Sequence, residues 1–230
     1  MQGWTFVFDL DGTLIDTAPD LIRATNYIMQ AEGLAPHPPA TLRPTISFGA
    51  RKLIIRGLEM HGHTRSRADI DALLARFLDY YADNIAVESR PFEALVDTLE
   101  TLARSGARLA VCTNKVERLS RILLAQLRLD THFAAITGRD TFPVCKPDPA
   151  HLTGAIEMAG GDRDRAIMIG DSEVDITTAK AAGIPVVAVT FGYPATPVED
   201  LAPDAIIGHY GELEDVARRL IARGAAGNAT

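Results

Sequence analysis

The sequence predicts an α/β fold in which a doubly wound, Rossmann-like parallel sheet carries a small α-helical domain inserted after its first strand. Three observations support this prediction. Short apolar runs alternate with helix-length amphipathic segments along most of the 230 residues. The apolar runs are almost continuous, which is typical of strands covered by helices on both faces. Residues 16–87 carry only helical periodicity.

The strands are expected where the apolar runs are rich in β-branched and aromatic residues. The expected strands are residues 4–8, 108–113, 166–169, 185–190 and 204–207. Residues 133–137 form a further segment of this kind, and a loop follows it as loops follow the other strands. Amphipathic, helix-length stretches lie between these runs, which predicts crossover helices and a parallel sheet.

The helices of the sheet domain are expected at residues 93–105, 115–129, 149–159 and 173–182. Leu95, Leu99 and Leu102 illustrate the spacing of four and three residues that places apolar side chains on one helix face. Gly106 ends the first of these helices, and Gly183 ends the last. The alternation of strand and helix indicates a doubly wound arrangement.

Residues 16–87 interrupt this alternation, because prolines and helical periodicity replace the strand runs there. Leu53 and Leu58 mark one helix, and Leu73, Phe77 and Tyr81 mark another. We therefore expect two domains, a sheet domain of residues 1–15 and 88–230 and a helical domain of residues 16–87. The two crossings between them, near 14–17 and 87–91, are the expected hinges.

The composition narrows the classes of partner. With 23 basic and 30 acidic residues the net charge is −7, which argues against a nucleic-acid or membrane-surface binder and allows a local site for small phosphorylated molecules. Two cysteines, Cys112 and Cys145, cannot form a disulfide framework. The N-terminus lacks the features of a signal peptide, and no apolar run is long enough to span a bilayer. We expect a cytoplasmic protein, with monomer and homodimer both open.

Polar side chains follow the predicted strands at the edge where parallel sheets bind their ligands. In chain order these are Asp9, Asp11, Thr113, Asn114, Lys146, Asp171 and Asp175. Each group alone has a simpler interpretation as a solvated turn or as the start of a helix. Their occurrence together on one edge favours a site for a divalent cation beside a phosphate.

Electrostatics explains why these residue types belong together. Two anions about 4 Å apart repel by about 4 kcal/mol at an effective dielectric near 20, so a phosphate approaches Asp9 only beside a cation. Mg²⁺ with oxygen ligands is the usual choice, and Lys146 adds further positive charge. Asp9 and Asp11 point to one side of an extended chain. One carboxylate can therefore act as a nucleophile and the other as a general acid and base.

Four strings of the sequence resemble the ordered motifs of haloacid-dehalogenase-type hydrolases. They are Asp9-x-Asp11-Gly12-Thr13, then Thr113, then Lys146, then Gly170-Asp171-Ser172-x-x-Asp175. The resemblance covers nearly the whole chain, and the inserted segment matches the small helical cap of subfamily I. Finer strings, residues 110–115, 146–149 and 179–183, are similar to the bacterial phosphoglycolate phosphatase family.

The resemblance implies roles for the acidic residues. It makes Asp9 the nucleophile that forms an aspartyl-phosphate and also a Mg²⁺ ligand. It makes Asp11 the general acid and base, whose backbone carbonyl binds the metal. Asp171 completes the metal site, and Asp175 is a ligand or a support for one.

The resemblance also implies a Mg²⁺-dependent phosphomonoesterase acting on a small metabolite, with 2-phosphoglycolate as the preferred substrate. It implies that Thr113 and Lys146 bind the phosphoryl oxygens and that Asn114 assists. The carboxylate of such a substrate needs a partner in the cap. The candidates are Arg43, Arg51 and Lys52.

One departure from the family pattern bears on the substrate. Ser47-Phe48-Gly49-Ala50 stands where these phosphatases usually carry a pair of glycines. If that pair shapes the carboxylate pocket, the preferred substrate differs. A sugar-phosphate phosphatase, a β-phosphoglucomutase-like enzyme and a non-catalytic regulatory member stay open as alternatives. The carboxylate of Asp11 counts against a dehalogenase or a phosphonate-cleaving enzyme.

Overall fold

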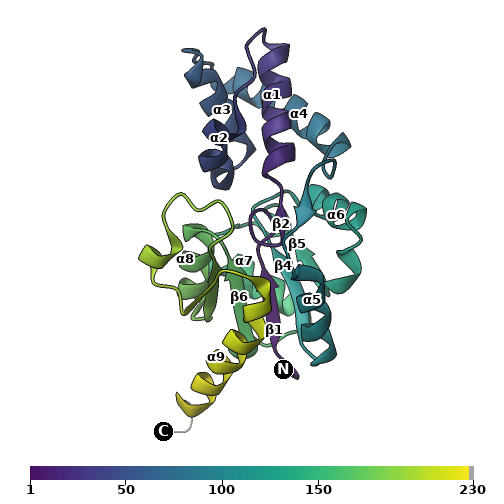
Figure 1. Ribbon diagram of the computed structural model, residues 1–230, viewed down its shortest axis with the longest axis vertical. Helices are drawn as coiled ribbons and strands as arrows, with labels where there is room; N and C mark the ends of the chain where they lie inside the picture. Colours follow the sequence, from purple (N-terminus) through teal and green to yellow (C-terminus); the bar gives the residue numbers. More distant parts are fainter. Residues whose placement is uncertain (228–230) are drawn as a thin grey trace.

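The computed structural model describes residues 1–227, so the last three residues of the predicted sheet domain lie outside the described part. Six parallel strands form the central sheet (Figure 1). Their order across the sheet is β5 (Ala135–Thr137), β4 (Arg108–Cys112), β1 (Thr5–Phe8), β6 (Ala166–Gly170), β7 (Val186–Val189) and β8 (Ala205–Ile207). The predicted doubly wound parallel sheet is confirmed.

Strand β1 lies in the middle of the sheet, between β4 and β6. Phe8 is in register with Val111 of β4 and Ile169 of β6. The residues that follow these three strands therefore meet at one edge. This is the edge at which open parallel sheets bind their ligands.

Helices cover both faces of the sheet, which explains the apolar runs. They are α5 (Leu95–Arg104), α6 (Glu117–Gln126), α7 (Pro149–Met158), α8 (Glu173–Ala182) and α9 (Leu213–Gly227). Val7 belongs to the core cluster that contains Leu152 of α7, whereas Phe6 and Phe8 belong to the cluster that contains Leu99 of α5. Successive residues of β1 thus face the helices on opposite sides of the sheet. Helix α9 has no counterpart among the predicted elements.

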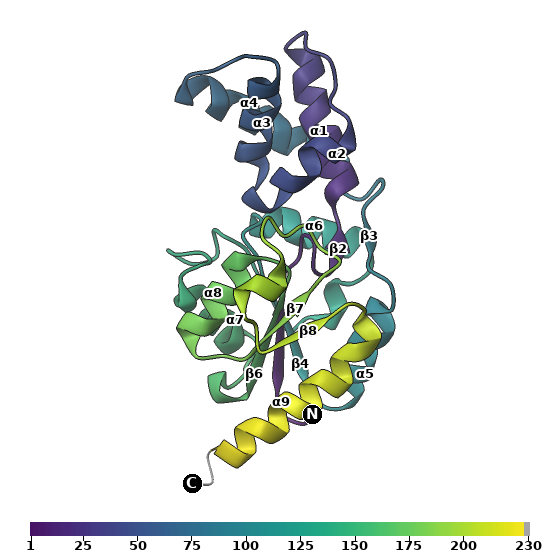
Figure 2. The ribbon, with the colours of Figure 1, turned by 60° about the vertical axis from the view of Figure 1, so that its left-hand side comes forward.

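The second group of helices stands above the carboxyl edge of the sheet (Figures 1 and 2). It consists of α1 (Ala18–Ala31), α2 (Pro39–Leu42), α3 (Ala50–Met60) and α4 (Arg67–Asp83). Helices α1, α3 and α4 contact one another, and Ile28, Leu53 and Phe77 are fully buried. We call these four helices and their loops the helical layer. The layer lies within the predicted limits of 16–87, and the domain boundaries themselves stay a prediction.

Two chain crossings connect the helical layer to the sheet. They pair as a short antiparallel ribbon of β2 (Ile15–Asp16) and β3 (Arg90–Pro91). The expectation that residues 16–87 contain no strand is therefore wrong at Asp16. Strands of two residues are too short to show an alternating pattern in the sequence.

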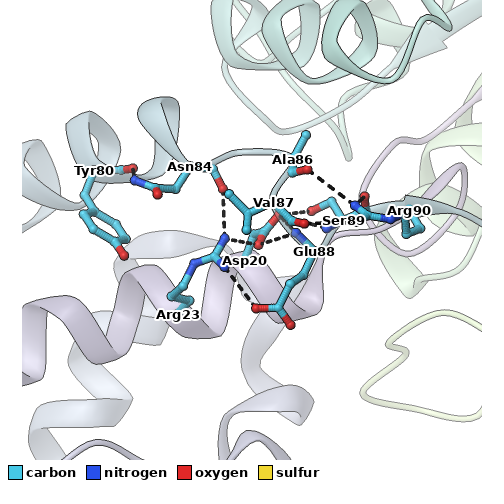
Figure 3. Close-up of polar contacts among 9 residues, drawn as sticks. All are labelled: Asp20, Arg23, Tyr80, Asn84, Ala86, Val87, Glu88, Ser89 and Arg90. Atoms are coloured by element: carbon cyan, nitrogen blue, oxygen red, sulfur yellow. Dashed lines mark hydrogen bonds and ion pairs between the residues drawn. The ribbon is translucent and has the colours of Figure 1, made fainter.

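A buried carboxylate fastens the crossings together (Figure 3). Asp20 in α1 accepts hydrogen bonds from the backbone N–H of Glu88 and from the N–H and the hydroxyl of Ser89, at 2.7–3.1 Å. Arg23 pairs with Asp20 and also donates to the backbone carbonyl of Asn84 at 3.1 Å. The first turn of α1 and the returning chain are thus held as one unit.

Short 3₁₀ segments complete the described structure. They are Arg43–Phe48, Asp130–His132, Arg163–Arg165, Val198–Leu201 and Tyr210–Glu212. In the part of the chain that the structure describes, no helix combines the length and the apolar character needed to cross a membrane.

Candidate active site

Three carboxylates from the ends of β1 and β6 and the start of α8 form a buried cluster. Asp9, Asp171 and Asp175 each offer an oxygen, and these oxygens lie within 4.8 Å of one another. All three residues are buried. Burial raises the pKa of Asp9 to about 6, although the nearby ammonium of Lys146 lowers it. Burial, with Asp175 and Asp9 close by, raises the pKa of Asp171 well above its usual range.

Such a cluster fits a divalent cation. Three hard oxygen donors converge where their mutual repulsion is costly, and Mg²⁺ prefers ligands of this kind. The buried Asp9 Oδ1 atom has no polar neighbour within hydrogen-bond distance among the described residues apart from Lys146 Nζ at 2.9 Å, and its second lone pair can accept an additional ligand. The predicted metal ligands Asp9, Asp171 and Asp175 are brought together, whereas the carboxylate of Asp11 is not a member of the cluster.

The backbone around Asp171 and Asp175 explains their positions. Asp171 follows β6 and accepts hydrogen bonds from the backbone N–H of Tyr193 at 2.7 Å and from the hydroxyl of Thr13 at 3.3 Å. Asp175 caps α8 by accepting from the N–H and hydroxyl of Ser172 at 3.1 and 2.6 Å. Asp175 therefore does stabilise the start of a helix, as one interpretation of the sequence suggested. Its other oxygen still reaches the acidic cluster.

Lys146 lies inside the cluster. Its Nζ atom is 2.9 Å from Asp9 Oδ1 and pairs with Asp175 Oδ1. Burial lowers the pKa of Lys146, but Asp175 and Asp9 outweigh burial and hold that pKa above its usual value. The ammonium therefore stays charged next to the carboxylate that is expected to attack.

The main chain of Lys146 is held on both sides. Its carbonyl accepts a hydrogen bond from Asn114 Nδ2 at 2.9 Å, and its N–H donates to His151 Nδ1 at 3.2 Å. Asn114, predicted to assist substrate binding, thus supports the lysine directly. Thr113 is buried beside it, and its hydroxyl accepts from the N–H of Lys115 at 3.2 Å.

A tight turn follows Asp11. Gly12 has φ of +83°, and a Cβ at this position would lie 2.4 Å from Asp171 Oδ2. The turn therefore requires glycine. The Asp11 carboxylate contacts a residue that was not predicted as part of the site. Lys115 Nζ donates to both of its carboxylate oxygens, at 2.9 and 3.1 Å.

A cavity of about 760 Å³ lies between the sheet edge and the helical layer. The sheet domain lines it with all of the predicted site residues except Asp175, and with Lys115. The helical layer contributes Arg51 and Lys52, whereas Arg43 is not among the lining residues. Arg43 instead faces Asp16, with its Nη2 atom 3.9 Å from Asp16 Oδ2. Arg51 is paired with Asp71, and Lys52 makes no ion pair with any described side chain.

The two cysteines have different surroundings. Cys112 is fully buried, and burial raises its pKa to about 12, so its thiol is not ionised near neutral pH. Cys145 is partly buried and lines the cavity. Neither is required by the arrangement around Asp9.

Comparisons with known proteins agree with this geometry. A family model described as "Haloacid dehalogenase-like hydrolase" matches residues 6–189. A Mesorhizobium japonicum protein named phosphoglycolate phosphatase is 48% identical over 216 residues, 94% of this chain and 95% of the relative. A Caulobacter vibrioides protein of the same name is 45% identical over 207 residues, 90% of this chain and 87% of the relative. A crystal structure from Haemophilus somnus, described as a predicted phosphoglycolate phosphatase, has a TM-score of 0.86 at 28% identity and covers 94% of this chain and 98% of its own.

Proposed function

The chain belongs to the haloacid dehalogenase-like hydrolase family and hydrolyses phosphoric monoesters, and from this premise we propose that it is a Mg²⁺-dependent phosphoglycolate phosphatase that works through a phosphorylated Asp9. The observation that carries the proposal is the buried group of Asp9, Asp171, Asp175 and Lys146 at the base of the cavity. It joins a nucleophile, a metal-binding set and a phosphate-binding cation in one place.

In the first step, an oxygen of Asp9 attacks phosphorus, and the bond from phosphorus to the ester oxygen breaks. The electron pair of that bond goes to the leaving oxygen, which takes a proton from Asp11. Lys146 and Thr113 bind the phosphoryl oxygens and offset their charge. Asp9, Asp171 and Asp175 would hold Mg²⁺, which supplies charge neutralisation between nucleophile and phosphate.

In the second step, water attacks the same phosphorus and gives its proton to Asp11. The bond from phosphorus to Asp9 breaks, the carboxylate is restored and inorganic phosphate leaves. Asp11 thus returns to the protonation state in which it began. The cavity walls exclude bulk water from both steps when the helical layer covers the sheet edge.

The substrate assignment draws on the relatives and on the charge of the cavity. Relatives 45% and 48% identical are named phosphoglycolate phosphatases. A substrate with a carboxylate needs a cation opposite the phosphate site. Lys52 suits this role, because it faces the cavity from the helical layer and lacks an ionic partner among the described side chains.

Phosphate release from a panel of monoesters tests the proposal. The panel contains 2-phosphoglycolate, glucose 1-phosphate and glucose 6-phosphate, each with Mg²⁺ and with a chelator. We expect Mg²⁺-dependent release, fastest from 2-phosphoglycolate, that is lost in Asp9→Asn. Asp140→Asn, at another acid that lines the same cavity, should keep wild-type activity. Wild-type rates in Asp9→Asn would overturn the mechanism, and a faster sugar phosphate would overturn the substrate assignment alone.

A further inference from the structure

Lys115 occupies a position between the two parts of the molecule. Its backbone belongs to the loop between β4 and α6, and its side chain is only 6% exposed. Its Nζ atom donates to both oxygens of Asp11 and to the hydroxyl of Tyr81, which is 2.8 Å away. A lysine ammonium has three donors. All three are therefore used by protein groups, and none is left for a substrate.

Tyr81 comes from the other side of the cavity. It lies near the end of α4, in the helical layer, and is almost completely buried. Its ring packs against Phe77 with centroids 5.9 Å apart, and the ammonium of Lys115 lies 4.5 Å from the ring centroid. Tyr81 is thus fixed by packing, and it presents one oxygen to Lys115.

These contacts form a chain of three groups, from Tyr81 through Lys115 to Asp11. The carboxylate of Asp11 needs a fixed orientation, because it must reach first the leaving oxygen and then the attacking water. Asp11 lies outside the acidic cluster, so the cluster does not supply that orientation. Lys115 does so by engaging both of its oxygens.

We propose that Lys115 and Tyr81 are positioning residues for the acid–base step, with Tyr81 of the helical layer holding the Lys115 ammonium against the Asp11 carboxylate. The proposal rests on the proposed function, because it assigns Asp11 the proton transfers of both steps. It adds a requirement on the helical layer that is separate from substrate binding. Tyr81 lines the cavity, and in this proposal it affects the rate through Asp11.

Substitutions that remove the polar contacts between Tyr81, Lys115 and Asp11 test the proposal. Tyr81→Phe deletes the oxygen that Lys115 contacts and keeps the ring that packs on Phe77. We expect kcat to fall about tenfold with little change in KM, since small misplacements of a reacting group cost up to about a hundredfold. Lys115→Met should lower kcat further. Tyr80→Phe is the matched control, because the Tyr80 ring stacks on Tyr27 and its hydroxyl makes no hydrogen bond with a described residue.

The decisive measurement repeats these changes in the Asp11→Asn background, by single-turnover phosphate release at high enzyme concentration. Groups that act only through Asp11 have no further effect once its carboxylate is gone, so Tyr81→Phe and Lys115→Met should each change the rate by less than about twofold there. An equal loss in both backgrounds would overturn the proposal and assign these residues a role in packing or substrate binding. Unchanged kcat in Tyr81→Phe would overturn it as well.

Activity measurements distinguish a failure of the proposed function from a failure of the positioning role. If the proposed function is wrong, activity in the otherwise unaltered chain does not depend on Asp9. If only the present inference is wrong, activity still depends on Asp9 and Asp11 but not on the hydroxyl of Tyr81. Thermal unfolding of each variant shows whether a lost rate reflects a lost fold.

Discussion

At the scale of single residues, the candidate nucleophile Asp9 and the candidate metal ligand Asp171 both hold their protons more readily than an ordinary aspartate. Burial raises the pKa of Asp9 to about 6, and it raises that of Asp171 well above its usual range. In the metal-free protein the folded state therefore binds protons that the unfolded state releases. Its stability falls as pH rises from the usual range of an aspartate through about 6.

We expect metal binding to oppose this dependence on pH. Mg²⁺ binds ionised carboxylates and competes with protons for them. We predict that Mg²⁺ raises the melting temperature more at about pH 8 than at about pH 5, because the carboxyl groups are neutral at the lower pH. Thermal unfolding with and without Mg²⁺ at both pH values measures this. A larger shift at the lower pH, or an undiminished shift in Asp171→Asn, would contradict the metal site.

The sequence predicted the candidate residues that follow strands, and the structure brings them close together, but the sequence did not predict a contact that depends on tertiary packing. Asp9, Lys146 and Asp171 were found because strand ends meet at one edge of a parallel sheet. Lys115 was missed although it lies two positions after Thr113. Its ammonium contacts Tyr81, 34 positions away in the chain, and no local pattern places the two together.

The elements of the sheet were predictable because their burial is visible in the sequence. Continuous apolar runs identified the central strands, and α8 matches its predicted limits of 173–182. The run 185–190 was predicted too long, since only Val186–Val189 pair as a strand. Helix α9 was not predicted, although Leu213, Val216 and Ala217 give it a buried face. The β2–β3 ribbon is defined by pairing between distant segments.

The two chain crossings between the sheet and the helical layer provide a prediction at the scale of elements. Asp20 is buried and satisfied by donors from the returning chain (Figure 3). Asp20→Ala leaves those donors and Arg23 without a partner, so we expect a loss of about 3 kcal/mol in the free energy of unfolding. Urea denaturation measures it. Asp83→Ala, at an exposed acid that makes no hydrogen bond or ion pair with a described side chain, should change stability by less than about 0.5 kcal/mol. Equal effects would show that the buried network contributes nothing.

At the scale of the whole molecule, the helical layer stands above the carboxyl edge of the sheet (Figure 2). The candidate reacting groups of the sheet line one side of the cavity, and the helical layer lines the other. We therefore expect that substitutions in the helical layer can change substrate selectivity without changing the reacting groups of the sheet. Sequence alone placed Arg43, Arg51 and Lys52 together as candidates, because all three lie in one short segment. Only the packing of α3 over the sheet edge separates the two that line the cavity from Arg43.

Lys52→Met tests that separation. We predict that it raises the KM for 2-phosphoglycolate about tenfold, since a charge-assisted hydrogen bond contributes roughly 1.5 kcal/mol or more. It should leave kcat and the inhibition constant of inorganic phosphate, which has no carboxylate, unchanged. Arg43→Met should leave the KM near its wild-type value. The opposite order of the two effects would exclude Lys52 as the partner of the carboxylate.

The central claim is that Asp9 becomes phosphorylated during turnover. The most direct test is a single turnover with the best substrate of the panel and Mg²⁺, quenched in acid and digested for mass spectrometry. We expect one phosphoryl group on the peptide that contains Asp9, formed and lost at rates consistent with kcat and absent in Asp9→Asn. A phosphoryl group on another residue would contradict the account, as would full turnover in Asp9→Asn.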